Sequence, residues 1–217
     1  MIFFEGLKTG MTTKMAAHDW KDGFLFLGND LALDFINTRP VQDGVPRELL
    51  PDFDALLRWF VAAGQINSRA SNTLRKKWET TRQAAAIVEA MRGFRERLRK
   101  AVLAWAATGS IPAATVDELN RLLAEYPMRT RLRSATKGAS TEQFFEVQHP
   151  GDLFAPLAYS AATLVATADR GRIRQCASCV LLFRDVSKRG MRHWCSMRLC
   201  GNRVKVAAYA ERQRRRQ

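Results

Sequence analysis

The clearest structural signal in the sequence is Cys176-Ala177-Ser178-Cys179, followed after fifteen residues by Cys195-Ser196-Met197-Arg198-Leu199-Cys200. It contains all four cysteines of the 217-residue chain. Structural zinc sites are tetrahedral and commonly use four thiolates, and a two-residue gap lets one tight turn bring two sulfurs to the same ion. The spacing therefore predicts that Cys176, Cys179, Cys195 and Cys200 bind Zn²⁺.

Three other interpretations of these cysteines stay open: buried free thiols, two disulfides, and a site in which His193 replaces one thiolate. The cellular compartment distinguishes metal binding from disulfides, because disulfides persist only under oxidising conditions. No stretch reaches the roughly 18 to 20 apolar residues of a membrane span, and Met1-Ile2-Phe3-Phe4 is followed at once by Glu5, which leaves no room for the apolar core of a secretory signal. We therefore expect a cytoplasmic protein without membrane contact, where reducing conditions favour metal over disulfides.

The residues around the cysteines predict the shape of this segment. Two apolar arms, Val180–Phe183 and Met191–Trp194, flank a polar stretch at Asp185–Gly190 whose residues are expected to form the turn of a β-hairpin. The second cysteine pair then begins a helix that continues through Val204 and Ala208. This order is typical of a treble-clef-like finger. Four bound thiolates leave no coordination position for water, so the metal is expected to hold the fold and not to catalyse.

The basic charge of the chain is concentrated in this segment. Of the net charge of +14, +11 falls on residues 171–217, which contain 13 Lys and Arg against Asp185 and Glu211. A localised positive field attracts polyanions, so we predict nucleic-acid binding. Arg203 is the first candidate because its guanidinium fork matches a guanine edge or a phosphate. The full predicted contact set is Arg203, Lys205, Arg198, Arg192, Lys188 and Arg189.

Several of these residues also have a structural interpretation. Lys188, Arg189 and Arg192 lie near the tip of the predicted hairpin and fit a solvated loop as well as a clamp on a phosphate backbone. Asn202 is expected to hydrogen-bond the backbone beside the metal, and Trp194 is expected to pack under the hairpin. These alternatives stay open at the level of sequence.

The rest of the chain predicts a mostly helical (α+β) fold: an N-terminal extension at 1–20, a helical domain with a small β-hairpin at 21–170, and the finger with its basic helix and tail at 171–217. Alternating residues in 129–133 and 142–148 predict the hairpin, and Asn29 is expected to cap a short segment. Apolar spacing predicts helices at Asp52–Ala63, from Ser68 or Ser71 through Trp105 with a break or bend near Gly93, from a capping box of Thr115 and Glu118 to Glu125, and at Asp152–Asp169.

Three polar residues of the helical domain, Asp34, Asn37 and Arg39, stand close together among apolar neighbours. They are candidates for a small-molecule pocket, with capping and turn roles as the alternative. The domain has no phosphate-binding glycine loop and no nucleophile motif, so an enzyme is not expected. In a regulator, this domain would bind a small-molecule effector or form a homodimer.

Two motifs resemble known families. The run from Arg192 to Lys205, with Phe183–Ser187 before it, resembles the CGNR zinc finger family, whose name matches Cys200-Gly201-Asn202-Arg203. Leu27-Gly28-Asn29-Asp30-Leu31-Ala32-Leu33-Asp34-Phe35-Ile36-Asn37-Thr38 is similar to the opening motif of the ABATE domain, which precedes this finger in bacterial proteins described as stress-induced transcription regulators. The resemblance implies a zinc-dependent DNA-binding regulator. Structured RNA or the ribosome, and a protein partner, stay open as alternatives, since the same charge serves RNA.

Overall fold

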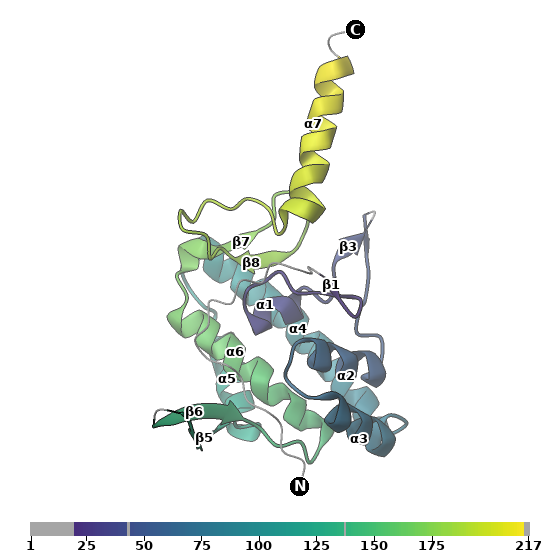
Figure 1. Ribbon diagram of the computed structural model, residues 1–217, viewed down its shortest axis with the longest axis vertical. Helices are drawn as coiled ribbons and strands as arrows, with labels where there is room; N and C mark the ends of the chain where they lie inside the picture. The colour runs from purple at the N-terminus through teal and green to yellow at the C-terminus, as the bar shows by residue number, and fades with distance from the viewer. Residues whose placement is uncertain (1–19, 43, 137, 215–217) are drawn as a thin grey trace.

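The computed structural model describes residues 20–42, 44–136 and 138–214. In Figure 1, a body of packed helices carries a small finger at one end, and the last helix, α7 (Asn202–Arg214), projects away from both. The predicted N-terminal extension lies outside the described residues up to position 19. None of the described helices is long and apolar enough to cross a membrane.

The body is built around the 27-residue helix α4 (Arg82–Thr108), which contacts helices before and after it in the chain. Its buried residues Val88, Met91, Leu98 and Val102 recur at helical spacing and form the face that packs into the core. The other helices of the body are α1 (Leu31–Ile36), α2 (Phe53–Ala62), α3 (Ser68–Trp78), α5 (Ala113–Glu125) and α6 (Phe154–Thr167), with the 3₁₀ turn η1 (Pro150–Leu153) before α6.

Short antiparallel hairpins complete the body. The hairpin predicted from 129–133 and 142–148 is confirmed, since Arg131 pairs with Glu142, but its second strand lies at 139–144. The hairpins are β1 (Trp20–Lys21) with β2 (Phe24–Leu25), β3 (Val41–Gln42) with β4 (Val45–Pro46), and β5 (Arg129–Ser134) with β6 (Ala139–Phe144). The predicted fold class, a mostly helical domain with a small hairpin followed by a four-cysteine finger, is therefore confirmed.

The core of the body is aromatic and contains one buried cation. The ring of Phe35 contacts those of Trp59 and Phe94, with centroids 5.6 and 6.2 Å apart. Beside them Arg95 is 1% exposed, and its guanidinium donates to both carboxylate oxygens of Glu48 at 2.8 and 2.6 Å. Burial raises the pKa of Glu48, but the hydrogen bonds from Arg95 and the Leu50 amide, with the charges of Arg95 and Arg92, together hold the pKa below its usual value. Since a buried charge needs a partner, Glu48 is what allows Arg95 in this core.

Two helix boundaries differ from the prediction. The long helical pattern does break, but after Trp78 and not near Gly93, which lies inside α4. Helix α4 begins where Thr81 accepts a hydrogen bond from the amide of Ala84 at 3.1 Å. Helix α5 begins at Ala113, without a side-chain cap, so the predicted capping box is wrong. When two successive helices pack on the same core, their apolar residues keep the same spacing across the break between them. The position of the capping residue then determines where the second helix begins.

The cap predicted for the first short helix is also one residue out of place. Asp30, and not Asn29, accepts the hydrogen bond that starts α1, from the amide of Ala32 at 2.9 Å. Asn29 has a φ of 56°, a left-handed conformation that asparagine tolerates better than most residues. This frees the Asn29 side chain for a contact with the finger, described below.

The finger begins directly after the body. The turn η2 (Arg170–Arg172) leads into β7 (Ile173–Gln175), which pairs antiparallel with β8 (Leu182–Arg184) around the first cysteine pair. The predicted pairing of 180–183 with 191–194 is therefore wrong, because β7 is the strand partner. Residues 185–196 form a loop instead, and the π-helical turn η3 (Met197–Gly201) then leads into α7.

Candidate metal centre and nucleic-acid interface

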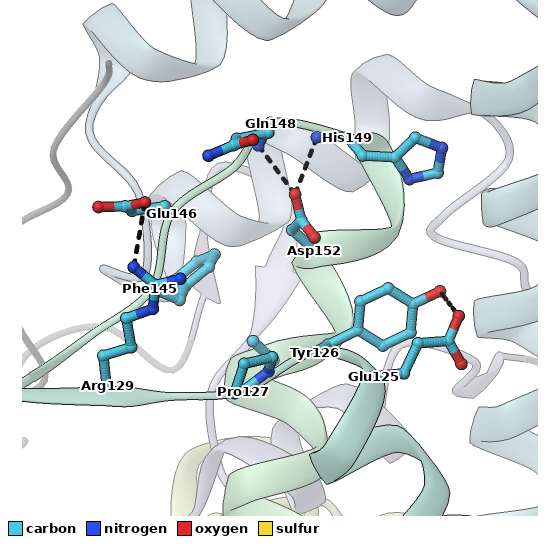
Figure 2. A pocket seen from close by; sticks show the side chains of 10 residues that line it. Glu125, Tyr126, Pro127, Arg129, Phe145, Glu146, Gln148, His149 and Asp152 are labelled. Atoms are coloured by element: carbon cyan, nitrogen blue, oxygen red, sulfur yellow. Dashed lines mark hydrogen bonds and ion pairs between the residues drawn. The ribbon is translucent and has the colours of Figure 1, made fainter.

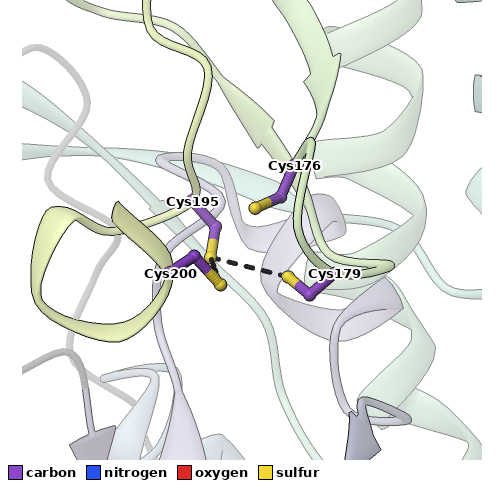
Figure 3. Close-up of side chains that lie close together, drawn as sticks. All are labelled: Cys176, Cys179, Cys195 and Cys200. Carbon is purple, nitrogen blue, oxygen red and sulfur yellow. Dashed lines mark hydrogen bonds between the residues drawn. The ribbon is translucent and has the colours of Figure 1, made fainter. Parts of the chain in front are cut away.

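The four cysteine sulfurs lie together at the base of the finger (Figure 3), with all ligand atoms within 4.8 Å of one another. The Sγ of Cys195 lies 3.7 Å from that of Cys179 and 3.6 Å from that of Cys200. A tetrahedral zinc ion with Zn–S bonds of about 2.3 Å requires sulfurs roughly 3.8 Å apart. The described cysteines therefore have the geometry that Zn²⁺ needs, whereas His193 is exposed and lies outside this group.

The backbone around each cysteine pair explains this geometry. The amide of Cys176 donates to Leu181 across the first turn at 2.9 Å, so that Cys176 and Cys179 lie on one tight knuckle. In the second pair, the Ser196 hydroxyl accepts from the amides that start η3, and the amide of Cys200 donates to the Ser196 carbonyl at 3.0 Å. A Cβ on Gly201 would lie 2.6 Å from the Met197 sulfur, so a larger residue would displace this exposed side chain.

The thiols are too crowded to ionise together. The hydrogen bond from Cys195 lowers the pKa of Cys179 to about 5, and the same contact, with burial, raises the pKa of Cys195. Burial also raises the pKa of Cys200, to about 11. A bound Zn²⁺ supplies the positive charge that lets all four cysteines be thiolates. With four such ligands, the ion has a structural role.

A buried carboxylate, Asp185, organises the loop after β8. It is 0% exposed, and it accepts hydrogen bonds from the amides of Ser187 at 2.9 Å and Arg192 at 2.8 Å. Burial raises its pKa, but these bonds and the charge of Arg174 outweigh that effect and hold the pKa below its usual value. The sequence indicated a turn-forming residue here. It did not indicate a buried charge that ties the two ends of the loop together.

Three arginines of the finger hold this loop with their guanidinium groups. Arg172 donates to the carbonyls of Asp185 and Ser187 at 3.1 and 2.8 Å, and Arg174 donates to that of Gly190 at 2.8 Å. Arg192, a predicted nucleic-acid contact, donates to the Trp194 carbonyl at 2.7 Å and packs over the Phe183 ring at 4.5 Å. Part of the basic charge of the finger therefore stabilises its own backbone.

Other predicted contact residues are exposed. Lys188 and Arg189 lie in the loop, Arg198 lies in η3, and Lys205 lies in α7. Arg203 lies in the first turn of α7, but its side chain is outside the part of the chain that the structure describes. The loop and α7 meet at the end of the finger farthest from α3 (Figure 1). Cations of both segments thus lie at the same end of the molecule.

The finger is docked on the body through the backbone of β8. The buried Asn37 amide group donates to the Leu182 carbonyl at 2.8 Å and accepts from the Leu182 amide at 2.9 Å. Nearby, the Asn29 side chain donates to the Arg184 carbonyl at 2.9 Å, and the amide of Arg184 donates to the Gly28 carbonyl at 2.8 Å. The residues on both sides of α1 therefore hold the backbone of β8 against the body.

Apolar side chains accompany these hydrogen bonds. Leu25 and Leu27, each 5% exposed, pack in one cluster with Leu181, Phe183 and the cysteines. Trp194 is partly buried against the same cluster. The hydrophobic core of the finger is thus completed by residues near the start of the chain, and this packing was not predicted from the sequence.

The three residues predicted as a ligand pocket have separate surroundings. The Asn37 side chain is hydrogen-bonded to the backbone of Leu182, as described above. Asp34 accepts from the amide of Gly28 at 2.7 Å, and burial raises its pKa to about 7. A Cβ on Gly28 would lie 2.6 Å from that of Leu33, so the close approach requires glycine. Arg39 points elsewhere: it is 46% exposed and lies 3.5 Å from Glu96.

Replacing Asn37 by alanine tests the docking contact. The substitution leaves the buried amide and carbonyl of Leu182 without partners, and we expect the free energy of unfolding to fall by about 2–4 kcal/mol. Urea denaturation of the zinc-loaded chain measures this loss, and hydrogen exchange at Leu182 should become faster. Asn120→Ala, on the exposed face of α5, is the matched control. Equal stability of the two variants would show that the docking contact contributes nothing.

A hollow of about 320 Å³ lies at the opposite side of the body, between the end of α5 and the segment before α6 (Figure 2). Its carboxylates already have partners. Tyr126 donates to Glu125 at 2.6 Å, and the backbone amides of Gln148 and His149 both donate to Asp152 at 2.8 Å. Nothing in this hollow indicates a ligand of a particular chemistry.

Comparison with known protein families agrees with the site. The family model ABATE, described as "Putative stress-induced transcription regulator", matches residues 29–168, and the model of the CGNR zinc finger matches residues 172–213. No curated protein matches the chain. Both descriptions are of regulatory and metal-binding domains, not of enzymes. Since the first match covers most of the chain and the second contains the four clustered cysteines, the chain belongs to the ABATE family and carries a CGNR zinc finger with Zn²⁺ as its cofactor.

Proposed function

We propose that this chain is a zinc-dependent DNA-binding transcription regulator whose finger contacts DNA through α7 and the loop at 185–196. The observation that supports this most is the exposed, basic helix α7, which projects from the docked finger (Figure 1). Its thirteen residues span about 20 Å at 1.5 Å per residue. A helix of this size and charge suits the major groove of DNA.

The division of the finger's cations supports the same proposal. Arg172, Arg174 and Arg192 hold the loop, so the candidates for DNA contact are the exposed residues. Exposed cations bind phosphates by releasing counterions, and they position the finger on the duplex without reading sequence. Arg203, at the start of α7, is the proposed base contact because arginine recognises guanine through two hydrogen bonds. The contacts proposed are Arg203, Lys205, Arg198, Lys188 and Arg189.

The helical body would then sense an effector or form a homodimer. The contact between the body and β8 supports a regulatory role. Asn37 of the body is hydrogen-bonded to β8, and Leu25 and Leu27 pack in the same hydrophobic cluster as the finger residues. A change in the body therefore has a direct physical route to the zinc knuckle. A regulator needs such coupling between two sites.

The test is a triple variant, Arg198→Gln with Arg203→Gln and Lys205→Gln, in the zinc-loaded full chain. We expect it to keep its zinc, since none of these side chains is a ligand, and to bind duplex DNA at least about tenfold more weakly at physiological salt. If Arg198 and Lys205 each contact one phosphate while Arg203 contacts a base, the slope of log K against log salt becomes less steep by about 2. Fluorescence anisotropy across a salt series, with random genomic DNA as competitor, gives both quantities.

A control variant removes the same charge from the far end of the body: Arg69→Gln with Lys76→Gln and Arg82→Gln, all exposed positions. It should bind DNA like the unmodified chain. Equal weakening by both triple variants would mean that net charge alone drives binding. Tighter binding to structured RNA than to duplex DNA, or equal binding to both and to heparin, would refute the DNA assignment.

A further inference from the structure

A second hollow, of about 160 Å³, lies where the body meets the zinc knuckle. Helix α4 forms one wall with Glu96 and Arg99, the segment after α1 contributes Ile36 and Arg39, and the finger contributes Val180. Val180 directly follows the zinc-site residue Cys179. The hollow is therefore the place in the described structure where a small molecule would touch the body and the knuckle together.

Arg99 has no ion pair with a carboxylate in this hollow. Its guanidinium is partly buried and donates to the Val180 carbonyl, a neutral acceptor. Among the described residues, no carboxylate oxygen lies within 4.0 Å of it; burial lowers its pKa, while Glu96 and the Cys179 sulfur attract it from farther away. A desolvated cation without an ion pair costs free energy, which a bound anion would offset.

Arg39 faces the same hollow from the other side. Its guanidinium is 46% exposed and lies 3.5 Å from Glu96, whose carboxylate also accepts from Arg95 at 3.1 Å. One carboxylate is thus shared between two arginines. Arg39 is free to turn toward an anion because its contact with Glu96 is long for a charged hydrogen bond.

The remaining wall is apolar and indicates what else the ligand must have. Ile36, Val41, Pro46 and Val180 line it. The volume is well below the roughly 300–1,000 Å³ of sites for drug-sized ligands, so the ligand is small. A small inorganic anion would leave these apolar side chains in contact with water, whereas an acid with an apolar body would bury them.

We propose that this hollow binds a small organic carboxylate, with its carboxylate between Arg39 and Arg99 and its apolar body against Ile36 and Val180. Binding draws Arg99 away from the Val180 carbonyl and thereby loosens the hold of α4 on the zinc knuckle. The ligand would be the effector of the regulator proposed above; that regulatory step rests on the proposed function, while the binding site does not.

Isothermal titration calorimetry of the zinc-loaded full chain with benzoate tests the site. Benzamide has nearly the same shape without the charge. We expect benzoate to bind with a dissociation constant of about 1 mM or below, and benzamide at least about tenfold more weakly. Arg39→Gln and Arg99→Gln should each weaken benzoate binding at least about tenfold. Arg97→Gln, on the same helix but paired with Glu118, is the control and should leave it unchanged.

Arg39 is exposed, so its variant is expected to fold even if the Arg99 variant does not. Undetectable benzoate binding, equal binding of benzamide, or full affinity in Arg39→Gln would each overturn the proposal. Inorganic phosphate that binds where benzoate does not would overturn the carboxylate assignment. The calorimetry contains no DNA, so its outcome is independent of the proposed function. A DNA titration with and without benzoate then tests regulation: an unchanged DNA affinity would overturn that step.

Discussion

Replacing Cys195 by serine is expected to remove zinc from the chain and to unfold the finger, while the helical body keeps most of its structure. Cys195 is 0% exposed, and its sulfur contacts those of two other cysteines. Structural zinc sites contribute an apparent ~10–16 kcal/mol to folding, which is as large as the ~5–15 kcal/mol of stability of a whole domain. Loss of one ligand is therefore enough to unfold so small a segment.

The measurements are metal content after dialysis against a chelator and far-ultraviolet circular dichroism. We expect zinc to fall from one ion per chain to nearly none, with a small loss of helical signal because α1 to α6 lie outside the finger. His193→Ala is the matched control, since this neighbouring side chain is exposed and should leave the metal in place. Retention of zinc by the serine variant, or its loss from the histidine variant, would change the ligand assignment.

Asp185→Ala is expected to have the next largest effect. The substitution removes the acceptor for the amides of Ser187 and Arg192 and leaves Arg174 without its acidic neighbour at 3.8 Å. Each of the two lost hydrogen bonds to this carboxylate contributes about 1.5–3 kcal/mol, whereas the Arg174 side chain is 36% exposed and remains solvated. The loop at 185–196 should then exchange its amide hydrogens freely, and zinc release to a chelator should become at least about tenfold faster.

The control for this variant is Asp117→Ala, an exposed carboxylate of α5. The pH dependence gives a second check. Because the fold holds the pKa of Asp185 below its ordinary value, its contribution to stability is present above that ordinary pKa and is lost as the pH falls below it. Unchanged loop exchange and zinc release in Asp185→Ala would mean that the loop is held by other contacts.

The zinc site was predictable because its information is local. Two close cysteine pairs specify a tetrahedral thiolate site almost independently of the rest of the fold, and the structure brings all four sulfurs together. The β5–β6 hairpin and the mostly helical class were predictable for a similar reason, since side-chain periodicity reports local structure. Helix boundaries were harder to predict, because the break at Thr81 depends on a capping hydrogen bond that the apolar periodicity does not reveal.

The contacts that join the finger and the body could not be predicted from the sequence, because they link residues far apart in the chain. Asn37 and Leu182 are 145 positions apart, and a polar residue after a short helix looks like a cap or a pocket residue until its partner is known. Arg99 likewise appears as one more cation on a helix. The β7–β8 pairing was missed for a different reason: apolar arms on both sides of a turn favoured the wrong strand partner.

The packing of Leu25 and Leu27 in the core of the finger has a consequence for synthesis on the ribosome. These leucines are made well before Phe183 and the cysteines that cover them. Until then the nascent body carries an uncovered apolar edge, which is the kind of surface that chaperones bind and that aggregates form on. When zinc is scarce, the finger is not completed and this edge stays uncovered after release. Zinc binding by the finger thus determines whether Leu25 and Leu27 are covered or remain accessible to chaperones.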